Sequence, residues 1–220
     1  YVMRNLFNPD NPFMRFLSRV GEMIMVNFFF LICSVPIVTC GASLAALHKV
    51  TQNIALDGDK GVVKTFFLAF RDNFKQATVV WLLVLLFFAG MVCNWLLMTA
   101  YTTGAALFAC KCIVGVLSVL VLSLCAYIFP LIARYENTLR EHFVNAGVLM
   151  IVKLPRTLAM VLLNALPAII AYFSLPLFFK TLIFWLLLGF AFASYIASTL
   201  LTPVFRELEN PDGPNVGLMN

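Results

Sequence analysis

The sequence predicts an all-α fold: a polytopic helical membrane protein with about five transmembrane helices and additional amphipathic helices at the membrane interface. Of the 220 residues, 62% are hydrophobic and only 11% are charged, whereas a soluble domain carries about 25% charged residues. Long apolar runs recur along the chain, and about 20 such residues in a helix cross the hydrocarbon core of a bilayer. The chain has too few polar side chains to cover its surface, so we expect lipid to cover the apolar part. We expect residues 1–220 to form a single membrane domain.

Polar or turn-forming segments separate the five predicted spans. The spans cover about residues 23–44, 77–99, 113–133, 157–173 and 181–201. Pro36 interrupts the first span, and because proline removes a helical hydrogen bond, a break is predicted near Ser34 to Pro36. At membrane depth the freed backbone groups need cover from protein or water. The predicted structural pivot comprises Pro36, Thr39, Gly41 and Ser43. For these residues we favour helix packing around a kink over ligand binding.

Two further segments have the apolar spacing of amphipathic helices. Residues 8–22 form the first, with Asn11 suited to the cap and Pro12 to the first helical position. This helix either lies in the lipid headgroup region or packs on neighbouring helices. Residues 62–76 form the second, and they supply the predicted partner-contact surface: Phe66, Phe70, Arg71, Asn73 and Phe74. Membrane anchoring is the alternative role for this surface.

The last span carries a second set of candidate contact residues. Gly189, Ala193 and Ala197 recur at every fourth position, so they form a small-residue face of a helix. Such a face lets two helix backbones approach closely. We expect it to contact either a partner subunit or another helix of this chain.

The basic residues predict an orientation in the membrane. With five spans, five of the 15 Lys and Arg residues lie on the side of the N-terminus and ten lie on the opposite side. The positive-inside rule then places segments 49–76 and 134–156 and the C-terminus in the cytoplasm, and the N-terminus outside. In the alternative topology, residues 23–47 form a re-entrant hairpin broken at Pro36. We favour five spans, because each limb of that hairpin would be too short to cross the bilayer.

The sequence carries no pattern typical of an enzyme. No phosphate-binding P-loop and no G-x-S-x-G motif occurs. The six cysteines form no C-x-x-C pair, so we expect no metal site, and nothing indicates a cofactor or a nucleic-acid partner. His48 and His142 lie next to charged residues and are expected to be solvated. We therefore predict no catalytic residues.

The middle of each span lacks ionisable side chains, which ion-coupled carriers and channels normally keep inside the membrane. The polar side chains that do occur in the spans are expected to hydrogen-bond between helices rather than bind a substrate. They include Asn27, Thr39, Asn94, Ser123, Asn164, Ser194 and Ser198.

Two strings near the start of the chain carry a family resemblance. NPFMRFLSRV, followed by NFFFLICSVPIVTCGASLAALHKV at Asn27–Val50, resembles the opening of the YesL family of bacterial membrane proteins, and Phe66 to Ala77 resembles the next stretch. The family occurs mainly in Gram-positive bacteria. Its members are typically encoded beside carbohydrate ABC importers, sugar-binding lipoproteins and sometimes sensor kinases.

The resemblance implies a non-catalytic accessory membrane subunit of a carbohydrate ABC importer in the bacterial plasma membrane. Such a subunit would pack on the permease and stabilise or regulate it, with the ATPase and the sugar-binding protein as further partners. An autonomous small-solute transporter or facilitator is one alternative, with residues 34–41 lining a polar path. A signalling scaffold that links the importer to a sensor kinase is another.

Overall fold

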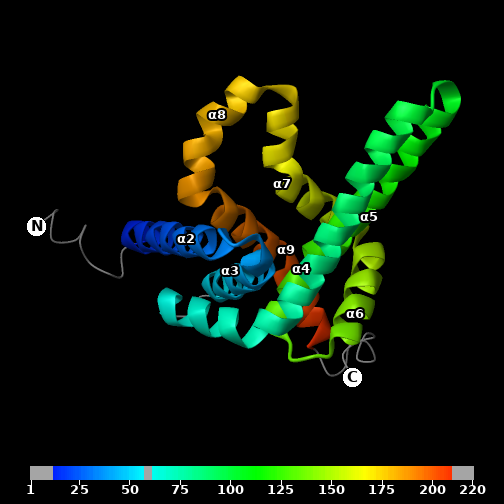
Figure 1. Cartoon of the computed structure of the whole chain (residues 1–220). Coiled ribbons are helices and arrows are strands. Elements are labelled where there is room, and N and C mark those ends of the chain that lie inside the picture. Colours follow the sequence, from blue (N-terminus) through cyan, green and yellow to red (C-terminus); the bar gives the residue numbers. More distant parts are fainter. Residues whose placement is uncertain (1–11, 57–60, 210–220) are drawn as a thin grey trace, which may run out of the picture.

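The computed structural model describes residues 12–56 and 61–209, and this part of the chain is built from helices (Figure 1). In order they are α2 (Pro12–Ser34), η1 (Ile37–Thr39), α3 (Cys40–Ala55), α4 (Val62–Tyr101), α5 (Gly104–Arg134), α6 (Leu139–Val152), α7 (Leu154–Phe173), α8 (Leu175–Phe184), η2 (Trp185–Gly189) and α9 (Phe190–Leu208). Within it, the segments long and apolar enough to cross a membrane are Phe13–Ser34, Val62–Tyr101, Gly104–Arg134, Leu154–Phe173 and Leu175–Leu208. They correspond in order to the predicted spans, which confirms the predicted fold class.

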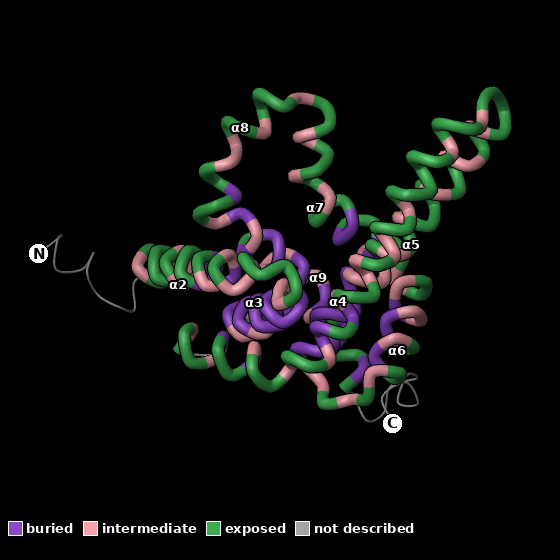
Figure 2. The backbone as a smooth tube through the Cα atoms, viewed as in Figure 1, coloured by how far each residue is buried: buried purple, intermediate pink, exposed green. Residues whose placement is uncertain are grey.

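Helix α3 lies at the centre of the packed body, as the burial colours of Figure 2 indicate. Eleven of its 16 residues are buried, and it packs against α2, α4, α5 and α9. Small side chains such as Ala42, Ala45 and Ala46 are fully buried, which lets the surrounding helices approach its backbone closely. The helix that follows the break at Pro36 is therefore the one around which the other helices pack.

The predicted first span at 23–44 is divided into two helices. Helix α2 ends at Ser34 and α3 begins at Cys40, which confirms the predicted break near Pro36. The two helices pack against each other on either side of the short η1 turn. This helix–break–helix arrangement corrects the expectation of one kinked span. It has the local form of the re-entrant alternative, whose placement relative to a membrane stays a prediction.

Helix α2 also extends further toward the N-terminus than the predicted span. It begins at Pro12, as its suitability for the first helical position predicted, whereas Asn11 lies outside the described residues. The amphipathic segment and the apolar run are thus one helix. Phe16 and Leu17 are 64% and 52% exposed, so the described residues leave this part of the apolar face largely uncovered. Of the two roles predicted for the segment, the burial favours contact with lipid.

The charged stretch that begins at His48, expected from its charge and its Asp57-Gly58 pair to be a loop, is helical as far as Ala55. Helix α3 continues to Ala55 because its polar residues face other helices, and α4 begins at Val62. The Asp57-Gly58 pair lies outside the described residues. The amphipathic helix predicted at 62–76 and the span predicted at 77–99 form one helix, α4, which bends before it leads away from the body (Figure 1).

Two helical hairpins project from the body. The C-terminal half of α4 and the N-terminal half of α5 form one hairpin, and α7 and α8 form the other (Figures 1 and 2). Their apolar side chains are exposed, among them Leu86, Phe108 and Ile183. An apolar surface of this extent on a helical hairpin requires lipid or other membrane helices as cover.

Candidate functional site: a polar pocket beside the central helix

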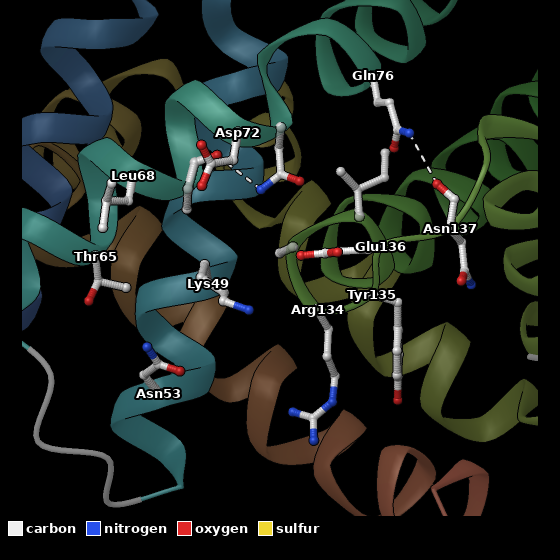
Figure 3. A pocket seen from close by; sticks show the side chains of 14 residues that line it. Lys49, Asn53, Thr65, Leu68, Asp72, Gln76, Arg134, Tyr135, Glu136 and Asn137 are labelled. Atoms are coloured by element: carbon white, nitrogen blue, oxygen red, sulfur yellow. Dashed lines mark hydrogen bonds between the residues drawn. The ribbon is translucent and has the colours of Figure 1, made fainter.

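A polar pocket of about 450 Å³ opens beside α3. Figure 3 shows its lining side chains, which come from α3, from the first third of α4, and from the end of α5 with the chain that follows it. They are Lys49, Asn53, Thr65, Leu68, Ala69, Asp72, Asn73, Gln76, Ile132, Ala133, Arg134, Tyr135, Glu136 and Asn137. The pocket therefore forms where the two segments predicted to be cytoplasmic, 49–76 and 134–156, meet.

Helical spacing places the polar side chains of α3 and α4 in the pocket wall. Lys49 and Asn53 are four residues apart on α3, so they share one face. Thr65, Asp72 and Gln76 recur at helical intervals along α4, and Asp72 and Lys49 line the pocket from the two helices (Figure 3). The wall is thus predictable from the sequence once the two helices are known to lie side by side.

Hydrogen bonds hold the third wall, which connects α5 with α6. Gln76 Nε2 donates to the carbonyl oxygen of Asn137 at 3.0 Å, and so ties this connection to α4. Helix α6 begins with a capping box, in which Thr138 Oγ1 accepts from the backbone N–H of Glu141 and the Glu141 carboxylate accepts from the N–H of Thr138. The box satisfies backbone donors at the helix start.

Arg134 anchors the end of α5 to the end of α9. Its Nε and a terminal nitrogen donate to the two carboxylate oxygens of Glu209 at 2.7 and 3.0 Å, and its guanidinium lies 4.8 Å from the centre of the Phe205 ring. The Tyr135 hydroxyl also donates to Glu209 at 2.9 Å. The hydrogen bond from Arg134, with a further one from Tyr135, lowers the pKa of Glu209 below its usual value of 4.5.

This ion pair predicts a pH dependence of stability. Because the folded-state pKa of Glu209 lies below 4.5, its stabilising contribution is present above that pH and is lost as the pH falls through the folded-state pKa. The pair is partly exposed, so we expect an effect below about 1 kcal/mol. Unfolding of the wild type and of Glu209→Gln, measured from pH 7 to pH 3, should show a steeper loss of stability for the wild type. Parallel curves would contradict the role of the ion pair.

The lining of the pocket is polar and of mixed charge. It presents charges of both signs, from Lys49, Asp72, Arg134 and Glu136, together with amide side chains. The described residues include no group of three or more potential metal ligands. The volume is in the range of sites that take small molecules, and it equally accommodates polar side chains from a partner's loop.

The predicted pivot residues lie together at the break between α2 and α3. The Thr39 hydroxyl lies 2.6 Å from the carbonyl oxygen of Cys33 and 2.8 Å from that of Pro36, so it covers the last turn of α2. The Ser43 hydroxyl donates to the carbonyl of Thr39 at 3.2 Å. From α4, Trp81 Nε1 donates to the carbonyl of Ile37 at 2.7 Å. Side chains of the protein thus donate hydrogen bonds to the backbone carbonyl oxygens at the break, as packing around a kink requires.

Gly41, the remaining pivot residue, lies at a close approach of α3 and α4. A Cβ atom at this position would lie 2.5 Å from Trp81 Cβ and closer still to the carbonyl oxygen of Ala77. The contacts of Thr39, Gly41 and Ser43 fit the favoured role in helix packing, whereas Pro36 is exposed. None of the four pivot residues lines the polar pocket.

Several of the predicted partner-contact residues are buried inside this chain. Phe66 is fully buried and packs near Phe29, with ring centres 5.9 Å apart. Of its set, Arg71 and Phe74 are exposed, Phe70 is half-buried, and Asn73 lines the polar pocket. The other set, Gly189, Ala193 and Ala197, is buried. That small-residue face is used by the chain itself, because α9 packs on α3.

A buried polar network connects α3 with α9. His48 Nδ1 lies 2.9 Å from Ser194 Oγ, which lies 2.8 Å from Thr51 Oγ1. Ser198 Oγ lies 3.1 Å from Thr51 Oγ1, and Gln52 Nε2 donates to the carbonyl of Pro130 on α5. The expected interhelical role of Ser194 and Ser198 is thereby confirmed. In the sequence, their spacing of four residues indicates that the two side chains share one face of the helix.

The expectation that both histidines are solvated is wrong. His48 is 8% exposed and His142 is fully buried. Each histidine lies on a face of its helix that other helices cover. The charged residues next to it in the sequence lie on other faces, so they do not indicate whether the histidine is exposed. Asn164 and Ser123 instead hydrogen-bond to carbonyls of their own helices, from Met160 and Val119.

Part of the chain matches a model of a protein family. Among curated proteins and among solved structures, none matches this chain. The stretch from Met23 to Trp95 contains the break, all of α3 and most of α4, including the pocket residues on both helices. This stretch, residues 23–95, matches the family model described as "Protein of unknown function, DUF624", the family known as YesL-like membrane proteins, in agreement with the resemblance in the sequence.

Proposed function

We propose that this protein is a non-catalytic accessory membrane subunit of a bacterial carbohydrate ABC importer, which packs on the permease and stabilises or regulates it. The importer context comes from the family resemblance. The structural observation that supports a docking role is the polar pocket. In the proposed orientation, with the N-terminus outside and the C-terminus in the cytoplasm, the pocket lies on the cytoplasmic side of the plasma membrane.

The pocket is suited to receive part of a partner protein. Its wall offers the carboxylates of Asp72 and Glu136 and the amide of Asn53, and the adjacent end of α5 adds backbone carbonyl oxygens with a partial negative charge. Cytoplasmic loops of membrane proteins are rich in Lys and Arg. A basic loop of the permease would find acceptors here, while the exposed hairpins α4–α5 and α7–α8 would contact its membrane helices.

The experiment is a mild-detergent purification of the tagged full-length protein from native membranes, with every co-purifying subunit identified and quantified. We expect permease subunits in stoichiometric amounts. Reversing the charge in the pocket with Asp72→Lys should reduce their recovery at least about tenfold, which corresponds to about 1.4 kcal/mol of binding free energy.

Lys75→Glu is the matched control, since Lys75 is exposed on the same helix but does not line the pocket. Its charge change has the same magnitude, and we expect recovery within about twofold of the wild type, a small effect for a position away from the contact. A wild-type protein that purifies alone would refute the accessory role. Solute uptake into liposomes containing only this chain would then favour an autonomous transporter, and recovery of a sensor kinase alone would favour the scaffold.

A further inference from the structure

A second cavity lies on the opposite side of α3 from the body's polar pocket, between α3, α7 and the junction of η2 with α9. Its volume is about 40 Å³, and its polar lining comes from His48, Asn164, Trp185 and Ser194. A buried water molecule occupies roughly 10–15 Å³ by this measure of volume, so the cavity has room for two or three. Its lining from α7 and from the η2–α9 junction belongs to segments that are long and apolar enough to cross a membrane, whereas α3 supplies the remaining wall.

One buried donor at this cavity has no acceptor in the protein. Trp185 is only 5% exposed, and its Nε1–H has no hydrogen-bond partner among the described residues. A buried polar group without a partner destabilises the folded state, because it loses its hydrogen bond to water. Such groups in native proteins are normally satisfied by protein or by ordered water.

Proline chemistry supplies acceptors on the facing helix. Pro167 lies inside α7, and because it has no N–H, it cannot pair with the carbonyl of Leu163 one turn earlier. Both residues line the cavity. Between them, Asn164 donates its Nδ2–H to the carbonyl of Met160 at 2.9 Å, which leaves its side-chain oxygen as a further acceptor.

We infer that this cavity is a water-binding site at membrane depth, in which ordered water bridges the Trp185 indole N–H to the acceptors of α7 at Leu163 and Asn164. Water fits because it accepts one hydrogen bond and donates two. A divalent metal ion does not fit, since the ten lining residues include no carboxylate and such ions need six or more oxygen ligands. An anion does not fit either, because none of the lining residues carries a fixed positive charge.

This water would attach the α7–α8 hairpin to the body. Few residues of α7 are buried, namely Thr157, Met160 and Val161 near its start, so direct packing holds only that end. A bridge at Leu163 and Asn164 adds an attachment one turn further along the helix. It also supports the ring of Trp185, which Gly189 accommodates by lacking a side chain.

The first test is a structure of the full-length protein in lipid nanodiscs at a resolution that shows ordered water, for the wild type and for Trp185→Phe. We expect density within hydrogen-bond distance of Trp185 Nε1 and of the carbonyl of Leu163 in the wild type. It should be lost or displaced in Trp185→Phe, which keeps the ring but removes the donor. A dry cavity in the wild type, with other buried waters visible, would overturn the inference.

The second test is a double-mutant cycle on unfolding with Trp185→Phe and Pro167→Ala, since alanine restores the N–H that pairs with Leu163. If water bridges the two sites, their effects should depart from additivity by at least about threefold in the unfolding equilibrium constant, as expected for residues in one network. Pro203→Ala is the control: Pro203 is an exposed proline inside α9 that does not line the cavity. It should be additive with Trp185→Phe. Additivity of Pro167→Ala as well would overturn the bridge.

Discussion

Replacing Gly41 by alanine is expected to destabilise the protein by about 3 kcal/mol, the upper end of the range for overpacking a core. The added Cβ would lie 2.5 Å from Trp81 Cβ and would overlap the carbonyl oxygen of Ala77. A flexible side-chain tip could move aside, but the obstacle here is the backbone of α4. Helices α3 and α4 would have to separate, and α3 is the central helix of the body.

Gly90→Ala on α4 is the matched control for this prediction. A Cβ atom at Gly90 meets no other atom within 4 Å, so only helix propensity changes, which favours alanine by up to about 1 kcal/mol. Both variants would be compared with the wild type by equilibrium unfolding in mixed detergent micelles. If Gly41→Ala unfolds like Gly90→Ala, the close approach of α3 and α4 is refuted.

The second large effect is expected from Asn27→Leu, which should lower the free energy of unfolding by about 2–3 kcal/mol. Asn27 is fully buried on α2. Its Nδ2 donates to the carbonyl oxygens of Trp185 at 3.2 Å and Leu186 at 2.7 Å, and its Oδ1 accepts from the N–H of Ala191 at 3.0 Å. The two carbonyls belong to the first residues of the π-helical turn η2, and Ala191 lies just after it. In such a turn the wider hydrogen-bond pattern leaves backbone groups without their usual α-helical partners.

Leucine at position 27 would keep the volume but leave those backbone groups buried without partners, at a cost of about 1–3 kcal/mol for each group that finds no substitute. Hydrogen bonds of side chains in membrane proteins are often worth less, about 0.6 kcal/mol on average, which limits the total. A local measurement complements unfolding: amide hydrogen exchange in peptides covering residues 185–191 should become faster. Asn94→Leu, at an exposed position of α4, should change neither quantity by much, and unchanged exchange in Asn27→Leu would contradict the role assigned to Asn27.

Features that depend on local rules were predictable. Pro12 begins α2, Ser34 ends it shortly before Pro36, and Thr138 with Glu141 forms the capping box of α6. Proline and capping residues act on the backbone within one turn, so their effect does not depend on the rest of the fold. The apolar runs likewise predict the membrane class, since no other solvent covers them.

The candidate site was predictable only in part. The two polar segments that meet in the pocket were recognised from their charge, but their meeting depends on α3, α4 and the end of α5 lying together. Phe66 was assigned to a partner, and the face that contains Ala197 to either a partner or this chain, and both residues are buried within the chain. An amphipathic or small-residue pattern identifies a face that must be covered, and it does not identify what covers it.

The sequence by itself determined the helical membrane class, the number of long apolar segments, the break at Pro36 and the start of α6, because these follow from composition and from interactions within a few residues. The tertiary structure alone decided that α3 is central, that Asn27 covers a helix more than 150 residues away in the chain at Trp185, and that His48 is buried against Ser194. Such contacts depend on which faces of distant helices meet, and packing of the whole chain selects that pairing.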